Sequence, residues 1–279
     1  MARSEAGHDS GRDVRRIGPV LVTGGTGRLG GLITTRLLSA GCPVRVLARR
    51  LPTADAAVDG VQYVAADLAE EGAGSGAFDG VETVVHCAGS AKGDEGKAQG
   101  VVRAAVRTGS PHVVFISVVG ADRIPVVSAA DRAMYGYFGE KLAAERVIER
   151  SGLPFTTLRA TQFHDFVWES CRLLAKSPVV PVPRIHFQPV DAADVADRMT
   201  ALALGPPAGL VAEMGGPRGF PFADLVRDHL RATGRRRLLL PLRQPGQAAR
   251  AFREGANLTQ SPAVGSRTWE SYVEERTRR

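Results

Sequence analysis

A glycine-rich segment near the N-terminus places the strongest constraint on what this chain can fold into. Residues 20–31 read VLVTGGTGRLGG, so a short apolar run leads into clustered glycines. Glycine permits backbone torsions that other residues avoid and lets another molecule approach the main chain. A strand, a glycine turn and a helix in this order predict a dinucleotide site, because amides at a helix N-terminus bind phosphates. The alternative is a tight strand-to-helix turn without a ligand.

The glycines fit two patterns. Gly25, Gly27 and Gly30 spell G-x-G-x-x-G, the general dinucleotide pattern. The second pattern, T-G-x-x-G-x-x-G, begins at Thr23 and uses Gly24 in place of Gly25. The glycines alone do not choose between the two patterns, which are typical of different enzyme families.

Strand-like and helix-like segments alternate along most of the chain. Short runs rich in apolar and β-branched residues are typical of buried parallel strands, and we expect them at residues 19–23, 44–48, 61–65, 83–87, 113–117 and 155–159. Apolar residues at helical spacing predict a helix that begins near Arg28 and further helices at residues 99–108, 135–150 and 191–204. This alternation predicts an α/β fold, with a doubly wound parallel sheet covered by helices on both faces.

The chain divides by pattern into three parts. Residues 1–16 are polar and charged, and we interpret them as a disordered leader. Residues 17–162 carry the alternating pattern and form the predicted dinucleotide-binding domain. Residues 163–279 are expected to be a smaller, irregular region on the substrate side, with 185–204 returning to the main sheet.

Composition excludes several classes of protein. The chain of 279 residues is 44% hydrophobic and 23% charged, and it has no apolar run near 18 residues, so we expect no membrane partner. Its three cysteines are far apart in sequence, which argues against a disulfide framework or a metal site and favours the cytoplasm. The net charge is +7, but aromatic residues are only 6% and no basic patch is interleaved with them, so we expect no nucleic-acid partner.

The end of the second predicted strand indicates which nicotinamide cofactor binds. NAD-dependent enzymes usually place an acidic residue there to hold the adenosine ribose, whereas this strand ends in Arg49 and Arg50. A guanidinium suits the 2′-phosphate of NADP(H), and Arg28 in the glycine turn can contribute. NADP(H) is therefore favoured, NAD(H) is the alternative, and solvated surface arginines are the non-functional interpretation.

Other strand ends complete the predicted cofactor site. Asp67 follows the third strand, where a carboxylate can accept the adenine amino group, and small residues follow His86 at the end of the fourth strand. His86 itself is interpreted as structural. The predicted cofactor-binding residues are Gly24, Gly25, Thr26, Gly27, Arg28, Leu29, Gly30, Arg49, Arg50, Asp67, Leu68, Cys87, Ala88, Gly89, Lys141 and Thr161.

The segment YGYFGEKLAAERVIERSG supplies candidate catalytic residues. Tyr137 and Lys141 are four positions apart and face the same way on a helix. Carbonyl reduction needs a proton donor beside the hydride donor, and a neighbouring ammonium lowers the pKa of a tyrosine from about 10 toward the working pH. Ser117, at the end of the fifth strand, can hold the substrate carbonyl. Lys141 can also bind the nicotinamide ribose.

These motifs, in this order, resemble the short-chain dehydrogenase/reductases in their extended or atypical branch. The resemblance rests on T-G-x-x-G-x-x-G, HCAG, the serine after strand five and Y-x-x-x-K, and it favours the second glycine pattern. LRATQFHDFV, FQPVDAADVADRM and GANLT…TWESYVEER are also similar to NmrA-like NAD(P)H-binding proteins. The segment GDEGKAQGVVRAA lacks the asparagine that many relatives carry on the helix before strand five.

The resemblance implies a Rossmann fold and an NADP(H)-dependent oxidoreductase acting on a small carbonyl or alcohol, with Ser117, Tyr137 and Lys141 as the catalytic set. Two alternatives stay open: a non-catalytic redox sensor, and an epimerase or dehydratase that uses its cofactor transiently. Single chains and homodimers both occur among relatives. On the substrate side, His164 is a weaker candidate for substrate contact, and Val179–Pro183 is expected to form the far wall.

Overall fold

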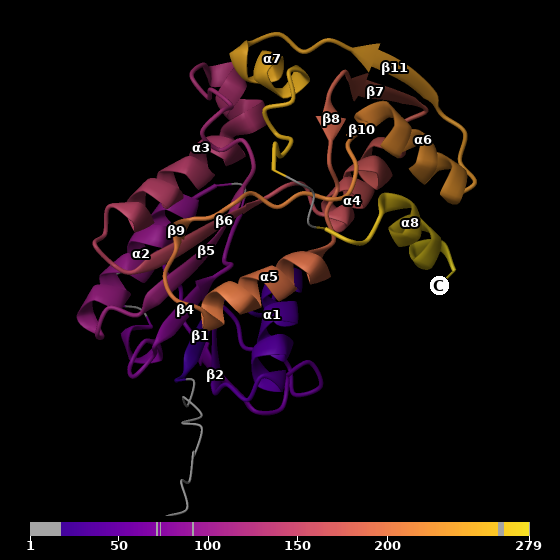
Figure 1. Cartoon of the computed structure of the whole chain (residues 1–279). Helices are drawn as coiled ribbons and strands as arrows, with labels where there is room; N and C mark the ends of the chain where they lie inside the picture. Colours follow the sequence, from indigo (N-terminus) through magenta and orange to yellow (C-terminus); the bar gives the residue numbers. More distant parts are fainter. Residues whose placement is uncertain (1–17, 71, 73, 91, 262–264, 279) are drawn as a thin grey trace, which may run out of the picture.

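A parallel sheet forms the centre of the protein (Figure 1). The computed structural model describes residues 18–70, 72, 74–90, 92–261 and 265–278. Within these residues the main sheet has seven parallel strands in the order β3-β2-β1-β4-β5-β6-β9. The strands are β1 (Val20–Thr23), β2 (Val44–Ala48), β3 (Val61–Ala65), β4 (Thr83–His86), β5 (His112–Val118), β6 (Phe155–Ala160) and β9 (Gly209–Leu210).

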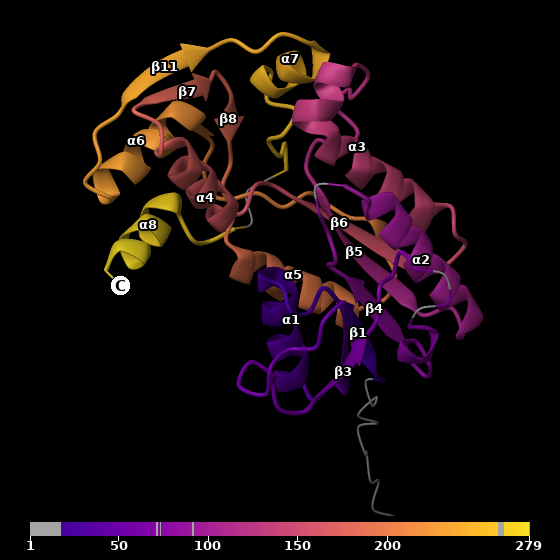
Figure 2. The same ribbon diagram turned by 180° about the vertical axis from the view of Figure 1, so that it is seen from behind.

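Helices cover both faces of this sheet (Figures 1 and 2). On one face α1 (Arg28–Ser39) packs beside α5 (Ala192–Leu204), and on the other α2 (Asp94–Arg107) packs beside α3 (Ala129–Glu149). Along β1 the side chains of Val20 and Val22 enter one core and that of Leu21 enters the other, as expected for a strand buried on both faces. The predicted fold class, a Rossmann-type doubly wound sheet, is confirmed.

The strand order places a binding crevice beside β1. From β1 the chain passes outward to β2 and β3 on one side, and then to β4, β5 and β6 on the other. Ligands of open parallel sheets bind at such a reversal, outside the carboxyl ends of the strands. The glycine turn follows β1, so it lies at this point.

All six predicted strands are present, with ends that differ by one residue or less. The helix starts are less accurate. The helix predicted at 135–150 begins at Ala129, because Ser128 accepts a hydrogen bond from the Asp131 N–H while the Asp131 side chain accepts one from the Ser128 N–H. This capping box starts the helix six residues before the predicted start. The helix predicted at 99–108 likewise begins earlier, at Asp94.

A second layer of short elements lies beyond the carboxyl ends of the main strands. It contains α4 (His164–Leu174), β7 (Val179–Pro183), β8 (His186–Phe187), β10 (Phe220–Pro221), α6 (Phe222–Ala232), β11 (Leu238–Leu242), α7 (Gln247–Arg253) and α8 (Trp269–Thr277). These elements enclose a core around Trp168, Phe222 and Trp269. The region predicted as irregular therefore has regular structure.

The predicted division of the chain remains a proposal. The residues from His164 onward form the second layer, except that α5 lies on the main sheet beside α1 and β9 extends that sheet. The predicted leader, residues 1–16, lies outside the described residues. Among the residues described, no helix is long and apolar enough to cross a bilayer.

Candidate functional site

The glycine turn between β1 and α1 depends on its glycines. Gly24 has φ +71°, and a Cβ there would lie 2.8 Å from the Ala88 nitrogen. A Cβ on Gly30 would lie 2.3 Å from the Gly24 oxygen, which accepts a hydrogen bond from the Gly27 N–H at 2.9 Å. Gly25 also has no room for a side chain, since a Cβ would lie 2.7 Å from Val46. Three of the four glycines, Gly24, Gly25 and Gly30, therefore leave no room for a side chain, whereas Gly27 is exposed.

The first turn of α1 offers free amides. Gly27 is its N-cap, no side chain caps this turn, and the turn contains no acidic residue. Thr26, Gly27 and Arg28 are exposed, and Leu29 is half-buried. An uncapped helix N-terminus behind a glycine turn fits the pyrophosphate of a dinucleotide, because both its N–H groups and its dipole favour an anion.

The adenosine side of the crevice carries the predicted arginines. Arg49 and Arg50 follow β2 and are exposed, and neither forms an ion pair within the described chain. Asp67 is half-buried, and its Oδ1 accepts a hydrogen bond from the Ala69 N–H at 3.0 Å. Leu68 packs in the core under α2, so its side chain is structural and only its main chain is left for a ligand.

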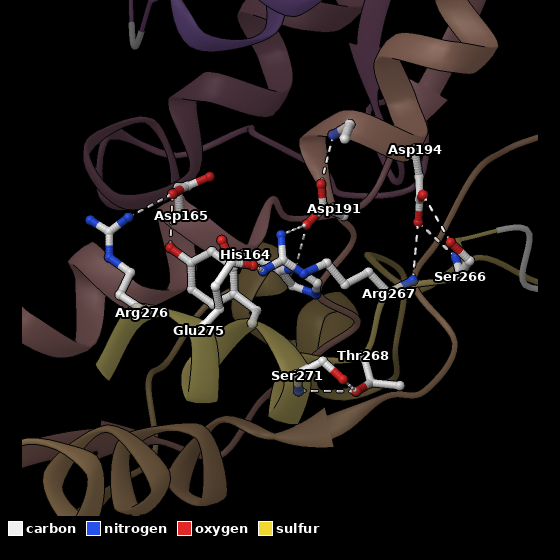
Figure 3. Close-up of polar contacts among 12 residues, drawn as sticks. His164, Asp165, Asp191, Asp194, Ser266, Arg267, Thr268, Ser271, Glu275 and Arg276 are labelled. Carbon is white, nitrogen blue, oxygen red and sulfur yellow. Dashed lines mark hydrogen bonds and ion pairs between the residues drawn. The ribbon is translucent and has the colours of Figure 1, made fainter. Parts of the chain in front are cut away.

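Arg28 forms an ion pair with α4 of the second layer. Its Nε lies 2.5 Å from Oδ2 of Asp165, the second residue of α4. Asp165 Oδ1 also accepts a hydrogen bond from the Tyr272 hydroxyl at 2.8 Å and lies 3.4 Å from Arg276, both on α8 (Figure 3). The predicted contact of Arg28 with a 2′-phosphate would have to compete with this ion pair.

The residues after β4 connect the glycine turn with the helix that carries Lys141. Ala88 lies against Gly24, and a Cβ on Gly89 would lie 3.1 Å from Lys141 Nζ and 3.4 Å from Asp94 Oδ2. Desolvation raises the pKa of the Cys87 thiol to about 12. The two halves of the predicted site are therefore joined by three small residues.

Tyr137 and Lys141 lie on consecutive turns of α3, on the same side of the helix. Lys141 Nζ is 5.8 Å from the centre of the Tyr137 ring. Lys141 is 4% exposed and donates a hydrogen bond to the Ile116 carbonyl at 3.2 Å, whereas Tyr137 is 39% exposed. This arrangement brings a phenol and a buried ammonium together at the end of β5, as the spacing predicts.

Asp94, which the sequence analysis missed, is the partner of Lys141. Its Oδ2 lies 3.1 Å from Lys141 Nζ, and its Oδ1 accepts hydrogen bonds from the Ser90 N–H and from Lys97. Burial alone would raise the pKa of Asp94, but the charge of Lys141 and these hydrogen bonds outweigh burial and hold the pKa below its usual range. The sequence signal is an acid that follows a glycine at the start of a helix, in the segment where an asparagine is expected.

The surroundings of Tyr137 raise its pKa. Desolvation by the surrounding protein is the larger cause, and the charge of Asp94 adds to it. This direction is opposite to the sequence-based expectation, in which Lys141 lowers the pKa of Tyr137. The reason is that desolvation of the phenol and the charge of Asp94 both favour the protonated phenol.

Ser117 is buried on β5, one residue after Ile116, whose carbonyl accepts the Lys141 hydrogen bond. Its hydroxyl has no hydrogen-bond partner within the described part of the chain. Buried hydroxyls in folded proteins are usually paired. Ser117 therefore keeps the donor and acceptor that the predicted contact with a substrate carbonyl needs.

Three other polar residues near the site are structural. His86 bonds the Thr23 hydroxyl at 2.7 Å, and burial lowers its pKa to about 3, so it is neutral. The Thr161 hydroxyl donates its hydrogen bond to the Gln188 carbonyl, so this hydroxyl is not free to donate to the cofactor. His164 is fully buried between Trp269 and Tyr272, 3.5 Å from Asp191 (Figure 3), which agrees with packing and not with substrate contact.

Comparison with known proteins supports the fold and the cofactor class. The protein is similar to an NADPH-dependent quinone oxidoreductase from Escherichia coli solved with NADPH, at 19% identity, TM-score 0.75, and coverage of 92% of this chain and 99% of that chain. It is similar to triphenylmethane reductase from Citrobacter sp. complexed with NADP(H), at 20% identity, TM-score 0.72, and coverage of 92% and 99%.

A third similar structure is a nucleoside-diphosphate-sugar epimerase from Staphylococcus aureus, at 19% identity, TM-score 0.73, and coverage of 92% of this chain and 99% of that chain. No curated protein sequence matches the chain. At these identities the structures establish the fold alone. A sequence model described as NAD(P)H-binding matches residues 24–206, which is more than half of the chain. The chain therefore belongs to the NAD(P)H-binding family, and the resemblance inferred from its motifs is confirmed.

Proposed function

We propose that the protein is an NADP(H)-dependent oxidoreductase of the short-chain dehydrogenase/reductase type, which transfers a hydride between the nicotinamide and a small carbonyl or alcohol. The observation that carries this proposal is that the residues after β4 link the glycine turn to the Tyr137–Lys141 pair. Ala88 touches Gly24 of the glycine turn, and Gly89 lies against Lys141 of the Tyr137–Lys141 pair. A dinucleotide anchored on the first turn of α1 would run along this edge toward the phenol.

Each residue of the pair has a proposed role. The bound nicotinamide supplies or accepts the hydride. Tyr137 donates the proton to the oxygen of a carbonyl substrate, or accepts it in the reverse direction. Lys141, held by Asp94 and the Ile116 carbonyl, lies in position to bind ribose hydroxyls and to stabilise a phenolate. Ser117 orients the substrate carbonyl.

NADP(H) is the proposed cofactor, with NAD(H) as the alternative. Two exposed arginines without ion-pair partners follow β2, at the position where an acid would bind the ribose of NAD. Two of the similar structures contain NADPH or NADP(H), which agrees with this preference.

The second candidate is a non-catalytic NAD(P)H sensor. The raised pKa of Tyr137 favours it, because a phenol that resists deprotonation exchanges its proton slowly near neutral pH. An epimerase or dehydratase would use the same residues, and a similar structure is described as an epimerase. Turnover distinguishes these candidates.

Tyr137→Phe tests the proposed enzyme directly. We expect it to lower turnover by about 10²- to 10⁴-fold on a panel of quinones, aldehydes and ketones, because it removes the proton donor. The readout is oxidation of the reduced cofactor, followed by its absorbance. Binding of NADPH should be almost unchanged, since the phenol is not part of the glycine turn.

Tyr135→Phe is the matched control. Tyr135 lies two residues away on the same helix, but its hydroxyl donates to Gln244 at 2.6 Å, away from Lys141. This variant should keep the wild-type rate. Turnover that survives Tyr137→Phe would remove Tyr137 from the mechanism, and cofactor binding without turnover on any substrate would favour the sensor.

A further inference from the structure

The small sheet of β7 and β11 has an apolar face that nothing covers within the described chain. The two strands are parallel, with Leu238 opposite Val179, Leu240 opposite Pro181 and Leu242 opposite Pro183. Opposed residues share a face, and alternate residues point the other way. The outer face of this sheet consists of Val179, Pro181, Pro183, Leu238, Leu240 and Leu242.

Exposure confirms which face looks outward. Leu238, Leu240 and Leu242 are 67%, 53% and 43% exposed, and Val179 is 40% exposed. The alternate residues Val180 and Val182 are buried in the core of the second layer. Figures 1 and 2 both place β11 at the rim of the molecule, far from β1–β3. Contiguous exposed apolar surface of this kind marks an interaction site.

Only positive charges flank the outer face. Lys176 precedes β7 and Arg184 follows it, while Arg235 and Arg236 precede β11 and Arg243 follows it. All five side chains are exposed, and none forms an ion pair with a described residue. Residues 175–190 and 230–253 contain no aspartate or glutamate. The charge of this surface is therefore complementary to an anionic partner.

The geometry disfavours two kinds of protein partner, an added β-strand and a second copy of the chain. Leu238 donates its N–H to Pro178 and Leu242 accepts from the Arg184 N–H, so the alternate residues Leu239 and Pro241 turn their main chains to the open edge. Pro241 has no N–H to offer an added strand, which argues against β-augmentation. A second copy of the chain would bring the same cations against this rim, which costs energy by like-charge repulsion.

We propose that the outer face docks on an anionic lipid surface. The leucines enter the boundary between headgroups and acyl chains, and the flanking cations contact lipid phosphates. The face contains aliphatic side chains and prolines and no hydrogen-bonding side chain. Burying it among lipids therefore leaves no side-chain hydrogen bond unsatisfied. Binding by such a surface grows with buried apolar area and with attraction to anionic lipid. A spanning segment is not needed, and the sequence-based expectation of no membrane partner considered only spanning segments.

Flotation of the full chain with vesicles tests this proposal. The wild-type protein should float with phosphatidylcholine–phosphatidylglycerol vesicles at low salt, bind more weakly as salt rises, and stay unbound with phosphatidylcholine alone. The double change Leu238→Ser and Leu240→Ser should weaken binding by about tenfold or more, because it removes two apolar side chains from the contact. The control is Val106→Ser with Leu210→Ser, which changes similarly exposed residues elsewhere and should bind as wild type.

A second pair of variants tests the charges. Arg235→Gln with Arg243→Gln should weaken binding by more than about tenfold, and Arg103→Gln with Arg107→Gln on α2 should change it less. Circular dichroism and NADPH binding verify that each variant is folded. No flotation of the wild type at low salt, or flotation unaffected by the leucine changes, would overturn the proposal. Binding to polyglutamate but not to vesicles would assign the surface to an acidic protein, and a dimer that the leucine changes dissociate would assign it to a second copy.

Discussion

At the scale of single residues, Asp94 adds to the effect of burial on the electrostatics of the proposed active site. The spacing of Tyr137 and Lys141 predicts that they share a helix face, and they do. The spacing carries no information about Asp94, because its contact with Lys141 joins residues 47 positions apart that meet only when α2 packs on α3. Sequence alone therefore predicted the pair, whereas the raised pKa of Tyr137 in the protein without cofactor comes from burial and from Asp94.

Asp94→Asn should lower the pKa of Tyr137. The carboxylate raises that pKa, so a neutral amide removes the contribution and leaves the charge of Lys141 uncompensated beside the phenol. For carbonyl reduction, which needs the protonated phenol, the alkaline limb of the kcat/KM profile should move to lower pH. Glu95→Gln, one residue along and exposed, is the control and should leave the limb in place. An unmoved limb in Asp94→Asn would show that another group controls it.

Arg49→Asp should reverse the preference between NADPH and NADH. A carboxylate repels the 2′-phosphate and can bind the ribose hydroxyls, so the ratio of the two dissociation constants should change by about tenfold or more. Titration of cofactor fluorescence measures both constants. Arg107→Asp makes the same charge change at an exposed position on α2 and should leave the ratio as it is. A ratio equally unchanged in Arg49→Asp would refute the assigned role.

At the scale of secondary structure elements, the β1–α1 turn gives the clearest prediction. Gly24→Ala should abolish NADPH binding and destabilise the protein by about 3 kcal/mol or more, because it combines a positive φ with a clash against the Ala88 main chain. Gly41→Ala measures the cost of the positive φ alone, since Gly41 has φ +77° and no atom lies within 4 Å of a Cβ placed there. It should cost about 1 kcal/mol and leave cofactor binding intact. Urea unfolding compares the two, and equal costs would contradict the predicted clash.

The strands of the main sheet and the starts of α1 and α5 were predictable, and the starts of α2 and α3 were not. Each buried strand is a run of apolar residues, which is visible locally, as in VVFIS at residues 113–117. Helix starts depend on caps instead. The capping box of Ser128 and Asp131 lies outside the amphipathic pattern of α3, and Glu140 of α3 caps α2 by accepting hydrogen bonds from the Gly93 and Asp94 N–H groups. The second layer escaped prediction because β8 and β10 have only two residues each and prolines interrupt the apolar runs of β7 and β11.

At the scale of the whole molecule, α8 and the residues before it tie the second layer to the main domain. Arg267 pairs with Asp191 at 2.8 Å, and the Ser266 hydroxyl donates to Asp194 at 2.9 Å (Figure 3). Both acids lie at the start of α5, which packs on the main sheet. These contacts join residues more than 70 positions apart, so no local sequence pattern predicts them.

Asp191→Asn should reduce stability near neutral pH by about 1–2 kcal/mol, because it removes a buried carboxylate that binds Arg267, while Arg267 keeps its second partner, Glu275. His164, the Ala193 N–H and Arg267 hold the pKa of Asp191 well below its usual range. A group with a lowered pKa stabilises the fold above its unfolded value of about 4 and loses that contribution as pH falls further. The difference between variant and wild type should therefore shrink below about pH 4.

Urea unfolding at several pH values measures this effect. Asparagine still caps a helix, so the substitution isolates the charge of Asp191 from its cap on α5. Asp197→Asn on the same helix removes an exposed ion pair with Arg36 and should change stability by less than about 1 kcal/mol. A difference that stays constant down to acid pH would contradict the assigned role.

Two neighbouring side chains of α3 bind the first turn of α2, and this has a consequence for redesigning the protein. Glu140 accepts hydrogen bonds from the main chain of that turn and Lys141 pairs with its acid, so the helix bearing the phenol is tied to the loop behind Gly89. Efforts to admit bulkier substrates would do better to change residues outside this seam. Loosening the α2–α3 seam would disturb the proposed proton donor and the proposed ribose contact together.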